Sequence, residues 1–178
     1  PASLNVLGFV SFYGTGSLTA FNVASTNVSF TSVDGVLFSL DGASATLFAY
    51  PANKVGSTYT TPTSVSFAEG SLTPVTKIDY YAFQASKNLT TLDISEGVTT
   101  IMSGIAESAT LLSTINLPDS YTQMIGMPFS GASGITSLHI GKFLTSIEPG
   151  TFYQTGNLNS ITVDDDNPNY SARDGVLF

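Results

Sequence analysis

The chain has 178 residues, with five Lys and Arg against thirteen Asp and Glu and a formal net charge of −8. Apolar residues make up 42% of it and charged residues only 10%, which is too apolar for a disordered segment and poor in charge for an ordinary protein surface. Five scattered cations exclude nucleic acid as a main partner, the lack of Cys excludes disulfides and thiol chemistry, and no apolar run approaches the length of about 18 residues that a membrane-inserted helix needs.

The first expected element is a coil of residues 4–26 with six apolar positions. These are Leu4, Leu7, Phe12, Leu18, Phe21 and Val23. The same spacing returns near the end of the chain, where Phe152–Leu158 (FYQTGNL) matches Phe12–Leu18 (FYGTGSL). A longer repeating unit therefore begins again near residue 144, and we expect the parent protein to continue.

Residues 27–74 lie outside the regular spacing and are predicted to form a β-hairpin island. Two β-rich runs, Val36–Leu40 and Thr46–Tyr50, flank a turn-prone segment that contains Asp and Gly. Tyr59–Val65 is expected to return as an extended chain toward the next coil. Phe67–Thr73 is expected to form a loop-like insertion before the regular spacing resumes.

Four coils of equal length then follow without a gap, at 75–97, 98–120, 121–143 and 144–166, and the same apolar columns recur in each with a period of 23. One unit of this size cannot bury enough apolar surface to offset the cost of ordering its backbone, about 1–2 kcal/mol per residue, and must stack on its neighbours. Each coil contains one segment with alternating inward residues, which predicts a short strand. We expect one stacked row of Leu92, Ile115, Leu138 and Ile161.

The last segment, Asn167–Phe178 (NPNYSARDGVLF), ends with the same five residue types as Asp34–Phe38. This island motif, the aromatic anchor Ala82–Phe83 and the strand motif Leu112–Pro118 (LSTINLP) together resemble BspA-like leucine-rich repeats. The sequence departs from the family pattern because it lacks the Cys that often follows the Ala-Phe pair, and because that pair is degraded at Ile105–Ala106.

The resemblance covers nearly the whole chain and implies both a fold and a setting. We predict a single domain over residues 1–178: a β-rich solenoid of the α/β class, a right-handed leucine-rich-repeat superhelix whose coils are interrupted by hairpin islands at 27–74 and from 167–178 onward. The family implies an extracellular protein, secreted or at the cell surface, that is often linked with adhesion. Low Lys content and 47 Ser and Thr also suit an exported bacterial protein.

The candidate binding site is the concave face of the strands, whose outward side chains are polar. Its predicted members are Asn22, Thr91, Asp93, Thr114, Asn116, Ser137, His139, Ser160 and Thr162. Stacked strands place such residues about 4.8 Å apart, and the resulting polar ribbon suits hydrogen bonding to an extracellular protein or glycan. Outward positions of a half-buried sheet are polar in any case, so a purely structural explanation stays open for each residue.

Two other groups of residues are candidates for ligand contacts. Asp164–Asp166 gathers oxygen ligands as a Ca²⁺ loop does, but it lacks the spacing of a known calcium loop, and a solvated turn is the default interpretation. Tyr13, Tyr80, Tyr81 and Tyr153 could stack on sugars or pack between adjacent coils. We predict no metal and no cofactor.

No nucleophile, phosphate-loop or zinc-protease motif is present, and the single His argues against a His-centred triad. We therefore predict a non-catalytic binding or adhesion module and no enzyme. Two alternatives stay open. One is a passive spacer that presents another domain; the other is a polysaccharide-acting enzyme on a parallel β-helix, although nothing singles out a catalytic pair among the thirteen acids.

Overall fold

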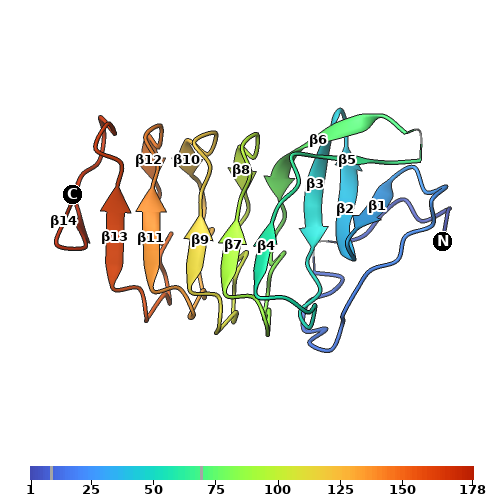
Figure 1. The fold of residues 1–178 in the computed structure, drawn as a ribbon, viewed down its shortest axis with the longest axis horizontal. Helices are drawn as coiled ribbons and strands as arrows, with labels where there is room; N and C mark the ends of the chain where they lie inside the picture. The colour runs from blue at the N-terminus through green and yellow to red at the C-terminus, as the bar shows by residue number, and fades with distance from the viewer. Residues whose placement is uncertain (9, 69) are drawn as a thin grey trace.

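The computed structural model describes residues 1–8, 10–68 and 70–178, and its short β-strands stand side by side along one axis (Figure 1). The main sheet is parallel, with the strand order β13-β11-β9-β7-β4. Its strands are β4 (Thr58–Thr60), β7 (Thr91–Asp93), β9 (Thr114–Asn116), β11 (Ser137–Ile140) and β13 (Ser160–Val163). The predicted β-rich solenoid is confirmed.

The register of this sheet forms the expected apolar row. Leu92 pairs with Ile115, Ile115 with Leu138, and Leu138 with Ile161. Side-chain hydrogen bonds between neighbouring strands repeat the period: Asn116 bonds to Asp93 and His139 bonds to Thr162, and the residues of each pair are 23 positions apart. The row is buried except at the end of the stack, where Ile161 is half-buried. Because strand side chains alternate between faces, the residues on either side of this row point outward.

A second row of very short strands runs along the coils. It consists of β8 (Thr100–Ile101), β10 (Gln123–Met124) and β12 (Ser146–Ile147). The pairing of β10 with β12 is parallel, and β8 pairs in parallel with the longer strand β6 (Leu72–Ile78). The buried side chains of Ile101 and Met124 close the core from this side.

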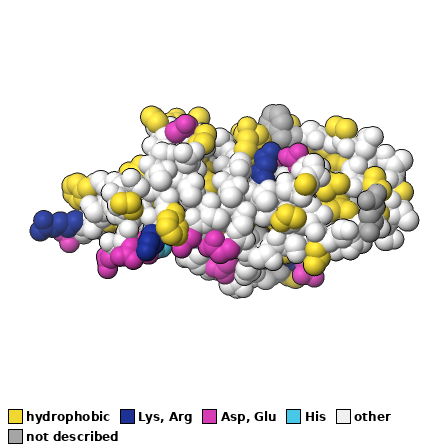
Figure 2. Space-filling view, turned by 90° about the horizontal axis from the view of Figure 1, so that it is seen from above, with side chains coloured by type: hydrophobic (Ala, Val, Ile, Leu, Met, Phe, Trp, Pro, Cys, Tyr) yellow, Lys and Arg dark blue, Asp and Glu magenta, His cyan; other side chains and the backbone are white. Residues whose placement is uncertain are grey.

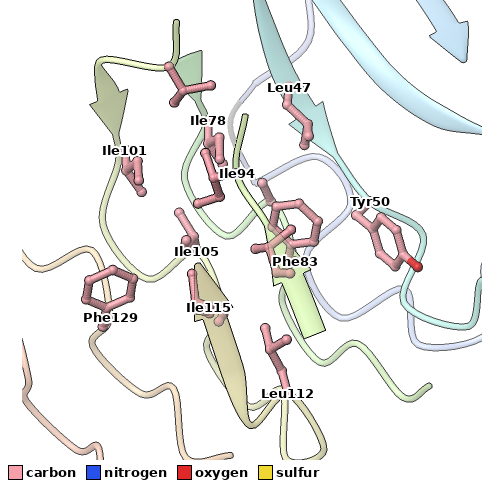
Figure 3. Packing of buried hydrophobic residues seen from close by; sticks show 14 of the residues in the cluster. Leu47, Tyr50, Ile78, Phe83, Ile94, Ile101, Ile105, Leu112, Ile115 and Phe129 are labelled. Atoms are coloured by element: carbon pink, nitrogen blue, oxygen red, sulfur yellow. The ribbon is translucent and has the colours of Figure 1, made fainter. Parts of the chain in front are cut away.

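The anchor residues of successive coils pack inside the molecule (Figure 3). Phe83, Ala106 and Phe129 are almost completely buried, and the rings of Phe129 and Phe152 are nearly parallel, with centroids 6.4 Å apart. Backbone bonds beside the anchors have the same period, since Gly104 N–H donates to Met127 O at 3.0 Å and Ile105 N–H donates to Pro128 O at 3.1 Å, each across 23 residues. The core and the backbone therefore impose the same register.

Hydroxyl side chains link one coil to the next. Ser113 Oγ donates to Thr90 O at 3.3 Å, and Thr145 Oγ1 donates to Thr122 O at 3.0 Å, each across 23 residues. Each carbonyl also accepts the backbone N–H of the same residue, at 3.0 Å from Ser113 and 2.8 Å from Thr145, so the hydroxyl adds a further hydrogen bond between coils. The high Ser and Thr content therefore has a structural role between coils.

The first island forms a separate sheet from the main one, and its strand β6 pairs with β8 of the second row. Its other strands are β1 (Phe30–Val33), β2 (Val36–Asp41), β3 (Ser44–Ala49) and β5 (Ser64–Ser66), in the order β1-β2-β3-β6-β5. The antiparallel pairing of β2 with β3 confirms the predicted hairpin. The parallel pairing of β3 with β6 connects the island to the coils.

The structure differs from the sequence-based expectation at two places in residues 27–74. Strand β4 belongs to the main sheet, because Thr60 pairs with Asp93. These two partners are 33 residues apart, so the regular period does not reveal β4. The segment predicted as an insertion instead closes a hairpin, since Val65 pairs antiparallel with Thr73. Glu69 of that segment lies outside the described residues.

Residues 4–26 also differ from the regular coils. The part described, residues 4–8 and 10–26, contains turns but no strand. Its apolar side chains form a second, smaller core with the island: Leu4, Leu7, Phe12, Phe21 and Val23 pack on Phe30, Leu37, Phe48 and Ala49. The bond from Phe21 N–H to Gly35 O at 2.8 Å has an equivalent in Ile161 N–H to Gly175 O at 3.1 Å. The two segments differ in their other neighbour: Ile161 pairs with β11, whereas none of the described strands pairs with residues 21–23.

The longer repeat is visible in the structure as two equivalent loops. Asn27 Nδ2 donates to Pro1 O and Leu4 O at 2.8 and 2.9 Å, and Asn167 Nδ2 donates to Gly141 O and Leu144 O at 2.8 and 3.2 Å. Each Oδ1 accepts two backbone N–H groups of the residues that follow. After Asn167 the antiparallel strands β14 (Ala172–Arg173) and β15 (Val176–Leu177) begin a hairpin as β1 and β2 do.

Two neighbouring leucines test the stacked core. Leu112 is fully buried and Leu111 is 54% exposed. We expect Leu112→Ala to lower the free energy of unfolding by about 2–5 kcal/mol, because it leaves a cavity, and Leu111→Ala to change it by less than about 0.5 kcal/mol. Urea unfolding followed by circular dichroism measures both, and equal losses would contradict the assignment of the core.

A half-buried carboxylate at the end of β6 gives a pH dependence. Burial raises the pKa of Asp79, while the Tyr80 N–H, 2.9 Å from Asp79 Oδ1, and Lys77 lower it and Asp41 raises it. Because the folded pKa exceeds the unfolded one, ionised Asp79 destabilises the fold above the folded pKa, and this penalty disappears below the unfolded pKa, about 4. We expect Asp79→Asn to raise the melting temperature at pH 7 and to leave it unchanged at pH 3.

The exposed Asp165→Asn variant is the control for this measurement, because it removes the same charge without relieving burial. A lower melting temperature of Asp79→Asn than of the parent protein at pH 7 would show that the ionised carboxylate stabilises the fold.

Candidate functional site

The outward side chains of the main sheet form two columns, which we call the strand face. The first column is Thr58, Thr91, Thr114, Ser137 and Ser160; the second is Thr60, Asp93, Asn116, His139 and Thr162. Eight of the nine residues predicted for the site lie in these columns, and each column takes one side chain from every strand of the sheet. The parallel register brings them together although they come from five separate segments of the chain.

Hydrogen bonds orient the second column. Asn116 Nδ2 donates to Asp93 Oδ1 at 2.6 Å, Thr60 Oγ1 donates to Asp93 Oδ2 at 3.4 Å, and His139 Nδ1 lies 3.0 Å from Thr162 Oγ1. Asp93 is half-buried, whereas Asn116, His139 and Thr162 are exposed. The column therefore presents pre-oriented donors and acceptors around one carboxylate.

Asn22 is the predicted site residue that the structure places elsewhere. It is exposed beside the small core of the N-terminal segment and belongs to none of the described strands. Its counterpart Thr162 is held in the sheet by pairing with β11, and none of the described strands pairs with the segment that contains Asn22. Thr58 and Thr60 of β4 occupy the first position of the two columns instead. The sequence signal for them was the alternation of polar Thr with the aromatic Tyr59 between them.

An acidic row borders the strand face at the carboxyl ends of the strands. Glu96, Asp119, Lys142 and Asp165 each lie three residues after a member of the second column. Glu96 accepts the N–H groups of Asp119 and Ser120 at 2.8 and 3.1 Å. Figure 2 shows Asp and Glu side chains gathered along one edge of the molecule, close to its histidine. This row is negative apart from one Lys.

The loop of Asp164–Asp166 has the geometry of a turn. Asp166 N–H donates to Asp164 Oδ1 at 2.9 Å, and Asp166 Oδ2 is 3.0 Å from Lys142 Nζ. The hydrogen bond and charge of Asp166 raise the pKa of Lys142. Over residues 1–8, 10–68 and 70–178, no group of three His, Cys, Asp or Glu is placed to hold a metal ion.

The candidate tyrosines divide into a cluster and a separate residue. Tyr13, Tyr80 and Tyr81 come together, with ring centroids 5.4 Å apart for Tyr13 and Tyr81 and 6.5 Å for Tyr80 and Tyr81. Tyr153 lies in a later coil and is 59% exposed.

The sequence profile of the BspA type leucine rich repeat region matches residues 59–172 in six copies. The chain belongs to the BspA-type leucine-rich repeat family. The comparison with curated proteins gives no match. BspA-type proteins are typically proteins of the bacterial surface or secreted ones, and the family is generally non-catalytic and linked with protein binding or adhesion. In the described part of this chain no helix has the length and apolarity that crossing a membrane requires.

Solved structures agree with this membership. The pneumococcal vaccine antigen PcpA is 26% identical, with a TM-score of 0.68 over 83% of this chain and 34% of that one. A leucine-rich repeat protein from Bacteroides capillosus is 22% identical, with a TM-score of 0.68 over 76% and 99% of the two chains. A leucine rich cell surface protein from Faecalibacterium prausnitzii is 18% identical, with a TM-score of 0.60 over 78% and 40%. The chain spans about a third of the PcpA structure.

Proposed function

We propose that this BspA-type repeat region is a non-catalytic adhesion module that binds an extracellular protein through the strand face. The observation that carries the proposal is the alignment of two polar columns across five parallel strands. An array of this kind offers an extended partner hydrogen-bonding side chains at each strand spacing.

The chemistry of the face selects among partners. Its columns contain one carboxylate, on Asp93, and the acidic row adds Glu96 and Asp119 beside it. With a net charge of −8 for the whole chain, association is steered toward a basic surface and weakens with added salt. The partner that fits best is therefore a protein segment rich in hydrogen-bond donors and positive charge.

The triple variant Asp93→Ala, Asn116→Ala, His139→Ala tests the proposal. We expect it to lose binding to the ligand found in an array of extracellular matrix proteins, by at least about tenfold, because a hydrogen bond to a charged group contributes about 1.5–3 kcal/mol. Its melting temperature stays close to that of the parent protein, since these side chains lie outside the core. Surface plasmon resonance and thermal unfolding measure the two effects.

The matched control is Thr100→Ala, Gln123→Ala, Ser146→Ala, which removes one polar side chain from each of the three short strands of the second row. This variant keeps the affinity. A parent protein without any ligand on protein and glycan arrays would instead indicate a passive spacer, and unchanged binding of the first triple variant would place the interface on another face.

A further inference from the structure

Tyr81 occupies a backbone position that suits glycine. Its φ is 56°, in the left-handed region that bulky residues avoid. At the same place in later coils the residue is Gly104 with φ 69° and Gly150 with φ 85°, whereas the coil between them has Met127 there and a positive φ at Gly126. A bulky side chain held in this backbone region makes the surroundings of its ring a place to seek a binding site.

The ring of Tyr81 lies at a meeting point of distant segments. It rests on Gly104, where an added Cβ would come within 2.6 Å of Tyr81 Cε1. Tyr13 arrives from the N-terminal segment with its ring at 82° to that of Tyr81, and its hydroxyl donates to Glu107 Oε1 at 2.9 Å across 94 residues of sequence. Two perpendicular aromatic rings and one carboxylate are thereby assembled.

These groups line an open depression together with Val10. Tyr13 is 50% and Val10 49% exposed, so the depression is accessible to a ligand. The hydrogen bond and charge of Glu107 raise the pKa of the Tyr13 phenol above its ordinary value. A sugar site needs several directional hydrogen-bonding groups, whereas aromatic faces beside a single carboxylate favour a cation.

We propose that Tyr13, Tyr81 and Glu107 form a second recognition site, separate from the strand face, that binds an alkylammonium group: the side chain of a lysine on a protein partner. A quaternary ammonium group has the same chemistry, and the two sources are distinguished by their probes. The site requires Tyr81 in place of glycine. It also requires the N-terminal segment to place Tyr13 beside Tyr81 and Glu107.

The direct test is titration of the whole chain, followed by the aromatic NMR signals of its tyrosines. The probes are Nα-acetyl-lysine-N-methylamide and tetramethylammonium chloride, with Nα-acetyl-norleucine-N-methylamide and tert-butanol as their neutral counterparts at equal ionic strength. We expect saturable shifts of Tyr13 and Tyr81 with the lysine probe, with a Kd of about millimolar, and none with the neutral compounds. Shifts with tetramethylammonium alone would overturn the assignment to lysine.

Variants separate recognition from structure. We expect Tyr81→Gly and Glu107→Gln to weaken lysine binding at least about tenfold. Tyr81→Gly keeps the melting temperature within about 5 °C, because glycine suits the left-handed backbone. Tyr153→Ala is the control: it removes the exposed ring that stands one position after the anchor Phe152, as Tyr13 stands after Phe12, and it leaves binding unchanged.

Equal binding of the norleucine and lysine probes would overturn the proposal. Unchanged affinity of both Tyr81→Gly and Glu107→Gln for the lysine probe would also overturn it. So would saturable binding of a neutral sugar such as maltose without any response to the lysine probe.

Discussion

Stacking at a constant register is the constraint on which the structure depends. One coil contributes only a short strand to the main sheet, too little to stand alone, and its apolar side chains reach full burial only between two neighbours. Leu92, Ile115 and Leu138 are buried because each has a coil on both sides, whereas Ile161, at the end of the described stack, is half-buried. The polar columns of the strand face follow from the same register, since each outward residue flanks an inward one.

Charge and hydroxyl content follow from this architecture. Hydroxyl side chains such as those of Ser113 and Thr145 add hydrogen bonds between coils to carbonyls that also accept backbone N–H groups. Long charged side chains are rare, and some of the acids, among them Glu96 and Asp119, lie together at the carboxyl ends of the strands. The strand face with its single carboxylate, Asp93, is thus bordered by further negative charge, which is the arrangement that the proposed basic partner would meet.

Periodicity in the sequence was sufficient to predict the row of Leu92 to Ile161 and the outward positions between 91 and 162. It failed where the chain length between strands changes. The paired residues of β4 and β7 are 33 residues apart. Asn22 matched the pattern without joining the sheet, because none of the described strands pairs with its segment as β11 pairs with β13. The apolar pattern gives only the number of residues between equivalent positions. Where an insertion changes that number, the pattern no longer predicts which residues stack on one another.

The tyrosine cluster shows a different limit of sequence analysis. Tyr13 and Glu107 are 94 positions apart, and their meeting depends on how the island folds the N-terminal segment back. The left-handed backbone of Tyr81 has no counterpart in the apolar pattern, although glycine at positions 104 and 150 was a signal that side chains are restricted there. Contacts created by the island lie outside what a repeat alone predicts.

Deleting one coil measures the register most directly. Removal of residues 121–143 takes out one whole coil and joins Ser120 to Leu144, whose place in the coil equals that of Tyr121. The account predicts a protein that keeps its β-sheet circular dichroism and unfolds cooperatively at a somewhat lower temperature. Removal of residues 121–142 shifts every later side chain by one position, and the account predicts loss of cooperative unfolding. Equal stability of the two deletions would contradict a solenoid whose coils share one constant register.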